Sequence, residues 1–221
     1  LTSGVDYPPY KKCFDQLDSD HPTLSPKHGW SYSALVIDLN KDGLPEVITA
    51  NGNGIGPDLK DWYPSASAKI FVFKNTGGKL DTFKKVQTIP GPGKWPDQKG
   101  RKFSVWAADT QAADLDGDGD LDIVSASRDD DTIAWYENDG ASDPTWSAAN
   151  IDTNANGARN VYVADLDGDG DLDIVSASGN DDTIAWYEND GAADPTWTAA
   201  NIDTNADGAY GVFVADLDGD G

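Results

Sequence analysis

The chain of 221 residues carries a formal net charge of −23, from 39 Asp and Glu against 16 Lys and Arg. Such a surface repels nucleic-acid phosphates and anionic membranes, so we expect neither as a partner. The hydrophobic content of 38%, with eight Trp, predicts a folded protein rather than a disordered acidic one.

Residues 1–30 contain four Pro and few regularly spaced apolar residues, and they predict an irregular lead-in to the fold. Cys13 is the only cysteine, so it has no internal disulfide partner, and the two histidines, His21 and His28, lie in the same stretch. A chain that lacks Met and ends within a repeat is expected to be a processed form or a fragment.

An acidic stretch of nine residues recurs along the rest of the chain. The sequence Asp-Leu-Asp-Gly-Asp-Gly-Asp-Leu-Asp spans 114–122, recurs unchanged 51 residues later at 165–173, and begins again at Asp216. A degenerate copy at 38–46 keeps an oxygen-bearing side chain at positions 1, 3, 5 and 9. The copies therefore share the spacing of their oxygen atoms.

This spacing suits a hard cation, because alternate residues of a tightly curved loop point inward. Carboxylates at positions 1, 3 and 5 converge on one point, a backbone carbonyl at position 7 joins them, and the acid at position 9 closes the shell. Gly43, Gly119 and Gly170 stand at position 6, where the loop turns sharply. Calcium accepts about six to eight oxygen ligands in irregular geometry, so we expect calcium rather than magnesium.

The EF-hand is the main alternative for such a loop, and it needs Glu at position 12 and a helix on each side. Position 12 here is Thr49, Ser125 or Ser176, and the flanks at 123–126 and 161–164 are rich in β-branched and small residues. The motif therefore predicts a strand-loop-strand calcium site. An acidic turn without metal would leave the repulsion among five carboxylates unbalanced.

Each repeat predicts four short strands. In the third unit they span 161–165, 174–178, 183–188 and 196–202, separated by the acidic loop and by turns at 179–182 and 189–195. Four strands in a unit of about 50 residues are typical of a propeller blade. We therefore predict an all-β fold, a β-propeller of four-stranded antiparallel blades, of which the chain holds about three and a quarter as part of a larger ring.

The repeats divide the chain into the lead-in and a series of blades. Blades are expected at 31–104, 105–155 and 156–208, and residues 209–221 would supply the first strand and a partial calcium loop of a further blade. Residues 70–77 align with 133–140, and Phe83 aligns with Trp146 and Trp197. The sequence Asp109-Thr110-Gln111 is expected to make a poor first strand. The pairs Trp135-Tyr136 and Trp186-Tyr187 are expected to pack between blades.

Two insertions, at about 52–68 and 90–106, lengthen the first blade. They follow its second and fourth strands, so they project from the face opposite the calcium loops. They carry Trp62, Tyr63 and Trp95, our candidate ligand-binding residues, since loops on a rigid scaffold commonly bind partners. Alternatively, the insertions cover an open sheet edge or pack against the lead-in.

The acidic motif followed by Ile-Val, with Trp-Tyr-Glu-Asn-Asp-Gly at 135–140 and 186–191, resembles the VCBS and FG-GAP repeats, the latter known from integrin α subunits. The resemblance covers residues 31–221 and implies a calcium-binding propeller, commonly of about seven blades. VCBS is the nearer of the two, because the Phe-Gly and Gly-Ala-Pro signatures are absent. The implied calcium ligands are Asp38, Asn40, Asp42, the Leu44 carbonyl and Glu46; Asp114, Asp116, Asp118, the Asp120 carbonyl and Asp122; Asp165, Asp167, Asp169, the Asp171 carbonyl and Asp173; and Asp216, Asp218 and Asp220 of an incomplete last loop.

Three functions are compatible with this sequence. We expect a non-catalytic, secreted or cell-surface module, stabilised by calcium, whose loop face binds a protein or glycan partner or further blades. The alternatives are a carbohydrate-binding lectin and the accessory propeller of a polysaccharide-active or sugar-modifying enzyme. No catalytic constellation stands out, and a glycosidase pair would have to come from Asp58, Asp61 and Asp97 in the insertions.

Overall fold

The computed structural model describes residues 31–51, 69–77, 83–90, 107–128 and 130–217, and these residues form β-strands and no helix. The strands are β1 (Ser31–Ile37), β2 (Glu46–Asn51), β3 (Lys69–Asn75), β4 (Phe83–Pro90), β5 (Ala107–Ala113), β6 (Asp122–Ser127), β7 (Thr132–Asn138), β8 (Trp146–Asp152), β9 (Ala158–Ala164), β10 (Asp173–Ser178), β11 (Thr183–Asn189) and β12 (Trp197–Asp203). The part of the chain that the structure describes contains no helix with the length and apolar character of a membrane span.

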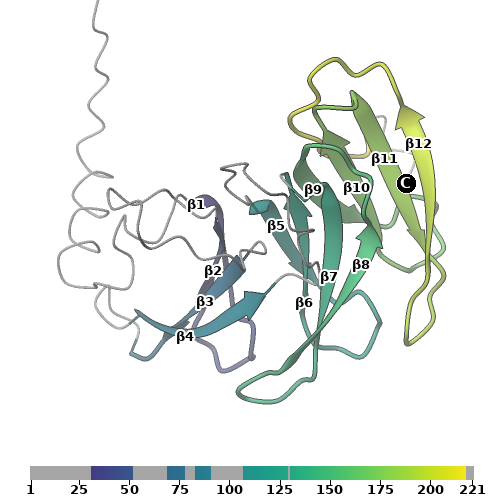
Figure 1. Ribbon diagram of the computed structural model, residues 1–221. Helices are drawn as coiled ribbons and strands as arrows, with labels where there is room; N and C mark the ends of the chain where they lie inside the picture. The colour runs from purple at the N-terminus through teal and green to yellow at the C-terminus, as the bar shows by residue number, and fades with distance from the viewer. Residues whose placement is uncertain (1–30, 52–68, 78–82, 91–106, 129, 218–221) are drawn as a thin grey trace, which may run out of the picture.

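The strands form three four-stranded sheets in which each strand pairs antiparallel with its neighbours in sequence. We call β1–β4 blade 1, β5–β8 blade 2 and β9–β12 blade 3. The first strands of the blades lie side by side, because β5 contacts both β1 and β9, and the last strands lie at the periphery (Figure 1). This is the stacking of propeller blades, and the three described blades form an open arc rather than a closed ring. The predicted fold class is confirmed.

The core lies between blades rather than inside one sheet. Strands β6 and β10 share the sequence Asp-Ile-Val-Ser-Ala-Ser and are buried at every position, as expected where both faces of a sheet are covered. Leu115, Val124 and Trp135 of blade 2 pack with Val161 and Tyr187 of blade 3 in one cluster. Leu39, Ile48 and Val72 of blade 1 pack with Ile123 and Tyr136 of blade 2 in another. Each blade is therefore stabilised largely by its neighbour.

The aromatic pairs of the third strands pack as predicted, with one difference. Trp135, Tyr136 and Tyr187 are buried between blades. Trp186 is only half-buried, since blade 3 is the last described sheet and its outer face has no further sheet against it.

Two sequence predictions about first strands were wrong. Asp109-Thr110-Gln111 lies within a strand, β5, whose pairing with β6 shifts register between Ala107 and Asp109. Asp109 is tolerated there because its carboxylate accepts hydrogen bonds across the blade boundary from the side chain of Asn160 and the amide of Val161. Conversely, the strand expected at Val212 is not formed, because a strand needs a ladder partner and the described residues provide none beside 209–217. Val212 still donates to Asn160 Oδ1 at 2.8 Å.

The loops gather on two faces, as the up-and-down topology requires. On one face the acidic loops meet the turns after the third strands, where Asn138 Nδ2 donates to the Leu121 carbonyl at 3.0 Å. On the other face the turn after β6 meets the connection from β8 to β9, where Gly157 donates to Asp131 Oδ1 at 2.8 Å. The strand ends joined by the first insertion, Asn51 and Lys69, lie at this second face, and Pro90, after which the second insertion continues, pairs with Lys69 there. The insertions themselves lie outside the described residues, and so do Trp62, Tyr63, Trp95, Asp58, Asp61 and Asp97.

Candidate metal centres

The acidic loops join the first strand of each blade to the second. We call residues 38–46 loop 1, residues 114–122 loop 2 and residues 165–173 loop 3. The sixth residue of each, Gly43, Gly119 or Gly170, has a φ of 87°, 94° or 101°. These φ values lie in the left-handed region, which glycine adopts without steric cost. The backbone therefore agrees with the prediction that the sharp turn needs glycine.

Carboxylate oxygens converge in two of the loops. In loop 2, one oxygen each from Asp114, Asp116 and Asp118 lies within 4.8 Å of the other two. In loop 3, the residues that converge in this way are Asp165, Asp167 and Asp173. Repulsion among such close carboxylates is offset only by bound protons, backbone amides or a cation.

Backbone amides hold the loop 2 carboxylates in place. Gly119 donates to Asp114 Oδ2 at 3.0 Å, Asp118 donates to Asp116 Oδ1 at 3.1 Å, and Asp120 donates to Asp118 Oδ1 at 2.8 Å. Loop 3 repeats the pattern, with Gly170 donating to Asp165 Oδ2 at 3.1 Å. The other oxygen of Asp114, Oδ1, is buried and has no hydrogen-bond partner. A buried oxygen of this kind is available to a cation.

The ninth residue of the loop is a buried acid. Asp122 is inaccessible to solvent, and its two oxygens accept from Leu115 N at 3.2 Å and Asn138 N at 2.9 Å. Asp173 repeats this with Leu166 and Asn189, at 3.0 and 2.9 Å. Burial raises the pKa of the Asp122 carboxyl to about 6, and burial also raises the pKa of Asp116. A divalent cation beside these groups would favour their charged forms.

Loop 1 has the same outline with different side chains. The amide of Asp42 lies 3.1 Å from both Asp38 Oδ1 and Asn40 Oδ1, so these two oxygens also converge. Glu46 stands where Asp122 stands in loop 2. Its Oε2 accepts from Leu39 N at 3.1 Å, whereas its Oε1 is buried without a partner. Desolvation raises the pKa of Glu46.

Asp122 of loop 2 and Asp169 of loop 3 are not among the residues whose oxygens converge, and the remaining predicted ligands of these loops, Asp120 and Asp171, also lie outside the carboxylate clusters. The side chains of Asp120 and Asp171 are turned toward Gly140 and Gly191, where an added Cβ would overlap them. This orientation leaves only their backbone carbonyls for the role implied by the family resemblance. Asp216 is exposed, and Asp218 and Asp220 lie outside the described residues. The oxygen-only donor sets of loops 2 and 3 fit a hard divalent cation of irregular coordination.

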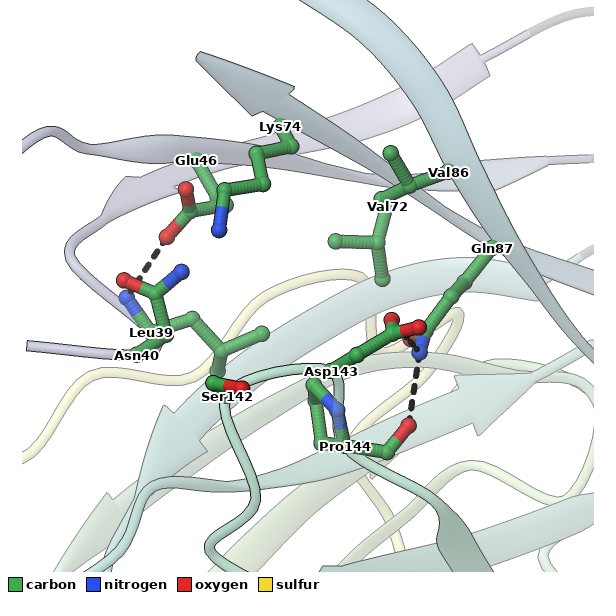
Figure 2. Close-up of a pocket in the computed structure, with 10 residues that line it drawn as sticks. All are labelled: Leu39, Asn40, Glu46, Val72, Lys74, Val86, Gln87, Ser142, Asp143 and Pro144. Carbon is green, nitrogen blue, oxygen red and sulfur yellow. Dashed lines mark hydrogen bonds between the residues drawn. The ribbon is translucent and has the colours of Figure 1, made fainter. Parts of the chain in front are cut away.

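A small hollow opens beside loop 1, between blades 1 and 2 (Figure 2). Val72, one of its lining residues, stands where Trp135 and Trp186 stand in the other blades. It is lined by Leu39, Asn40, Glu46, Val72, Lys74, Val86, Gln87, Ser142, Asp143 and Pro144.

Two residues that matter at these loops were missed by the sequence analysis. Lys41 of loop 1 contacts loop 2, and Asn189 of blade 3 contacts the loop 2 backbone. Asn189 belongs to the repeated Trp-Tyr-Glu-Asn-Asp-Gly, so the repetition itself was a signal for it. Lys41 replaces the glycine found at 117 and 168, and that departure from the repeat was its only signal.

Comparison with known protein families agrees with the repeat. A family model described as FG-GAP-like repeat matches residues 114–176 and again residues 165–221. No curated protein sequence matches the chain. The matched units are those that form blades 2 and 3, and the residues beyond them. Residues 114–221 therefore consist of FG-GAP-like repeats.

Proposed function

We propose that the chain is a calcium-stabilised, non-catalytic module of a secreted or cell-surface protein, which binds a protein or glycan partner through the face opposite loops 1–3. FG-GAP-like repeats are generally non-enzymatic and typical of extracellular proteins, which supports the class of function. Extracellular calcium modules bind calcium at about 10⁻⁴ to 10⁻³ M, a concentration found outside cells.

The observation that carries the calcium part is the convergence of three carboxylates in each of loops 2 and 3. Asp114 Oδ1 is buried and has no hydrogen-bond partner, which supports the proposal that a cation binds this loop. The protein has a net charge of −23, so any bound cation would also stabilise the fold by reducing the repulsion among its negative charges.

The experiment that tests the calcium part combines calorimetric titration with thermal unfolding. We expect calcium to bind at several sites and to raise the Tm by several degrees over the value in chelator. Magnesium at the same concentration should have a smaller effect, because it keeps its waters. Asp118→Ala should remove one site and leave loop 3 unchanged. An unchanged Tm in chelator, or an unchanged site count in Asp118→Ala, would refute the assignment.

The partner-binding part rests on the placement of the insertions. Their ends lie on the face opposite the calcium loops, and they bring aromatic residues to an acidic protein. The test is a glycan array with the calcium-loaded chain, repeated with Trp62→Ala combined with Trp95→Ala. Loss of binding in the double variant is the expected result. Binding that survives the double variant would move the partner site elsewhere.

A further inference from the structure

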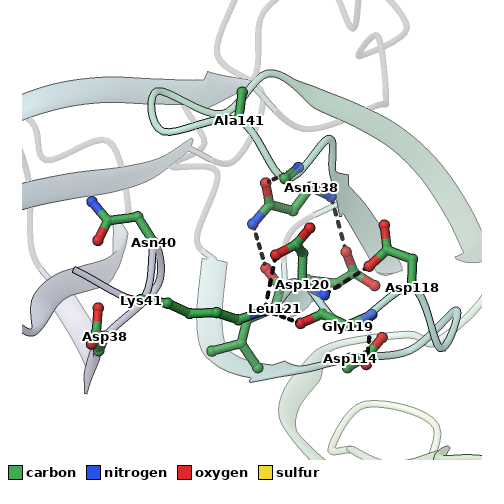
Figure 3. A network of polar contacts seen from close by, with 12 residues as sticks. Asp38, Asn40, Lys41, Asp114, Asp118, Gly119, Asp120, Leu121, Asn138 and Ala141 are labelled. Atoms are coloured by element: carbon green, nitrogen blue, oxygen red, sulfur yellow. Dashed lines mark hydrogen bonds and ion pairs between the residues drawn. The ribbon is translucent and has the colours of Figure 1, made fainter. Parts of the chain in front are cut away.

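Lys41 of loop 1 makes polar contacts with the neighbouring blade. Its ammonium group lies 3.0 Å from Asp120 Oδ1 and also donates to the carbonyl oxygen of Gly119, both in loop 2 (Figure 3). The two partners are 78 and 79 residues away in sequence. The contact therefore links the acidic loops of two adjacent blades.

The backbone at Lys41 shows that this lysine is an exception to the repeat. Its φ is 56°, in the left-handed region that disfavours side chains, and the equivalent Gly117 and Gly168 have φ values of 74° and 79°. Glycine would suit this position better for the local backbone. The contacts of the Lys41 side chain with loop 2 explain why a lysine stands at this position in spite of the backbone strain.

The residues that Lys41 contacts are those that orient the loop 2 carboxylates. Gly119, whose carbonyl accepts from Lys41, donates its amide to Asp114 Oδ2 at 3.0 Å. Asp120, whose carboxylate pairs with Lys41, donates its amide to Asp118 Oδ1 at 2.8 Å. Through Gly119 and Asp120, the lysine thus influences the orientation of two of the three carboxylates that converge in loop 2.

The same lysine lies between two predicted ligands of loop 1, Asn40 and Asp42. The amide of Asp42 is held by the side-chain oxygens of Asp38 and Asn40, so ordering of those side chains fixes the backbone on either side of Lys41. We infer that Lys41 is a positioning residue that couples calcium binding in loop 1 to calcium binding in loop 2. The inference rests on the proposed calcium sites.

The ion pair does not need to be strong for this role. Both side chains are partly exposed, and exposed pairs contribute little to overall stability. Coupling between two sites depends instead on whether ordering one loop favours the bound geometry of the other, and it acts equally in both directions. Loop 2 offers no lysine to loop 3, because Gly117 stands at that position. Loop 3 is joined to loop 2 through Asn189 instead, so it serves as the reference for effects of loop 1 that pass through Lys41.

The test is a site-resolved calcium titration of the ¹⁵N-labelled chain by NMR at low ionic strength, where the pair is least screened. The amides of Gly43, Gly119 and Gly170 report loops 1, 2 and 3 separately. We expect Asp38→Asn, which removes a loop 1 ligand, to raise the calcium midpoint at Gly119 by about threefold or more and to leave Gly170 unchanged. Glu46→Gln is the second loop 1 variant, used if Asp38→Asn perturbs folding.

The decisive comparison repeats the loop 1 variant in a Lys41→Met background. There the midpoint at Gly119 should no longer respond to Asp38→Asn, whereas in a Lys41→Arg background the response should return. An equal response with and without Lys41, or no response of Gly119 in the parent chain, would overturn the coupling while leaving the calcium sites intact. If none of the three glycines responds to calcium, the proposed function itself fails.

Discussion

The side-chain amide of Asn189 donates a hydrogen bond of 2.8 Å to the carbonyl oxygen of Leu115, in the neighbouring blade and 74 residues earlier in the chain. The same amide also donates to the carbonyl of Leu172 at 3.1 Å, and Asn189 Oδ1 accepts from Gly191 at 3.0 Å. One buried side chain thus joins loop 2, loop 3 and the turn after β11. The acidic loops are connected across blades as well as within them.

Replacing Asn189 by Ala should destabilise the protein more than the loss of a few side-chain atoms would suggest. Two backbone carbonyls would lose a donor, and leaving buried polar groups unsatisfied costs about 1–3 kcal/mol. The measurement is the free energy of unfolding in urea. Asn201→Ala on the exposed strand β12 is the matched control and should have little effect. Equal effects of the two substitutions would show that the bridge is unimportant for stability.

Tyr187 and Tyr136 occupy equivalent positions and offer a matched pair of substitutions. Both hydroxyls lie 3.4 Å from a serine, but Tyr187 also donates to Asp152 Oδ2 of blade 2 at 3.0 Å. Burial raises the pKa of both tyrosines, so each remains protonated at neutral pH. Tyr187→Phe should cost about 1.5–3 kcal/mol, since hydrogen bonds to charged groups are the stronger ones, and Tyr136→Phe about 1 kcal/mol. The measurement is the free energy of unfolding of both variants in denaturant. A larger loss of stability in Tyr136→Phe than in Tyr187→Phe would contradict the prediction.

Gly140 and Gly117 both have positive φ, at 67° and 74°, but their surroundings differ. A Cβ at Gly140 would overlap the Asp120 carboxylate, whereas a Cβ at Gly117 would meet nothing within 4 Å. Gly117→Ala should therefore cost only the left-handed backbone penalty of about 1 kcal/mol. Gly140→Ala should lower the free energy of unfolding by more, because the Asp120 carboxylate must also move away from the added Cβ and so from its partner Lys41. Unfolding free energies that are equal for the two variants would count against this packing.

Asp190 predicts a dependence of stability on acidic pH. Its carboxylate accepts from Thr196 Oγ1, Thr196 N and Ala192 N, at 2.5, 3.0 and 3.2 Å, and these bonds hold its pKa below the ordinary value. A folded pKa below the unfolded one stabilises the protein above about pH 4, and this contribution is lost as the pH falls through the folded pKa.

The measurement is the difference in Tm between the parent chain and Asp190→Asn as a function of pH. We expect the parent to be the more stable at pH 6 and the difference to shrink below about pH 4. The exposed Asp207→Asn serves as the control and should show no such trend. A difference in Tm that is constant from pH 6 to pH 2.5 would show that the Thr196 contacts do not depend on the charge of Asp190.

The sequence by itself determined the blade and its loops, because both follow from local patterns. Four strands of β-branched and aromatic residues per 51-residue unit predicted β9–β12 to within a few residues, and alternate acids predicted the carboxylate clusters of loops 2 and 3. Neither needs knowledge of residues far away in the chain.

Only the tertiary structure decided how the blades act on one another. The pairing of Lys41 with Asp120, the bridge from Asn189 to Leu115 and the strand that buries Asp109 all join residues from about 50 to 80 positions apart. Such contacts depend on how one sheet stacks on the next, which a repeat pattern does not encode. A lysine at a glycine position or an aspartate within a strand looks unfavourable in isolation and becomes favourable only when the neighbouring blade supplies its partner.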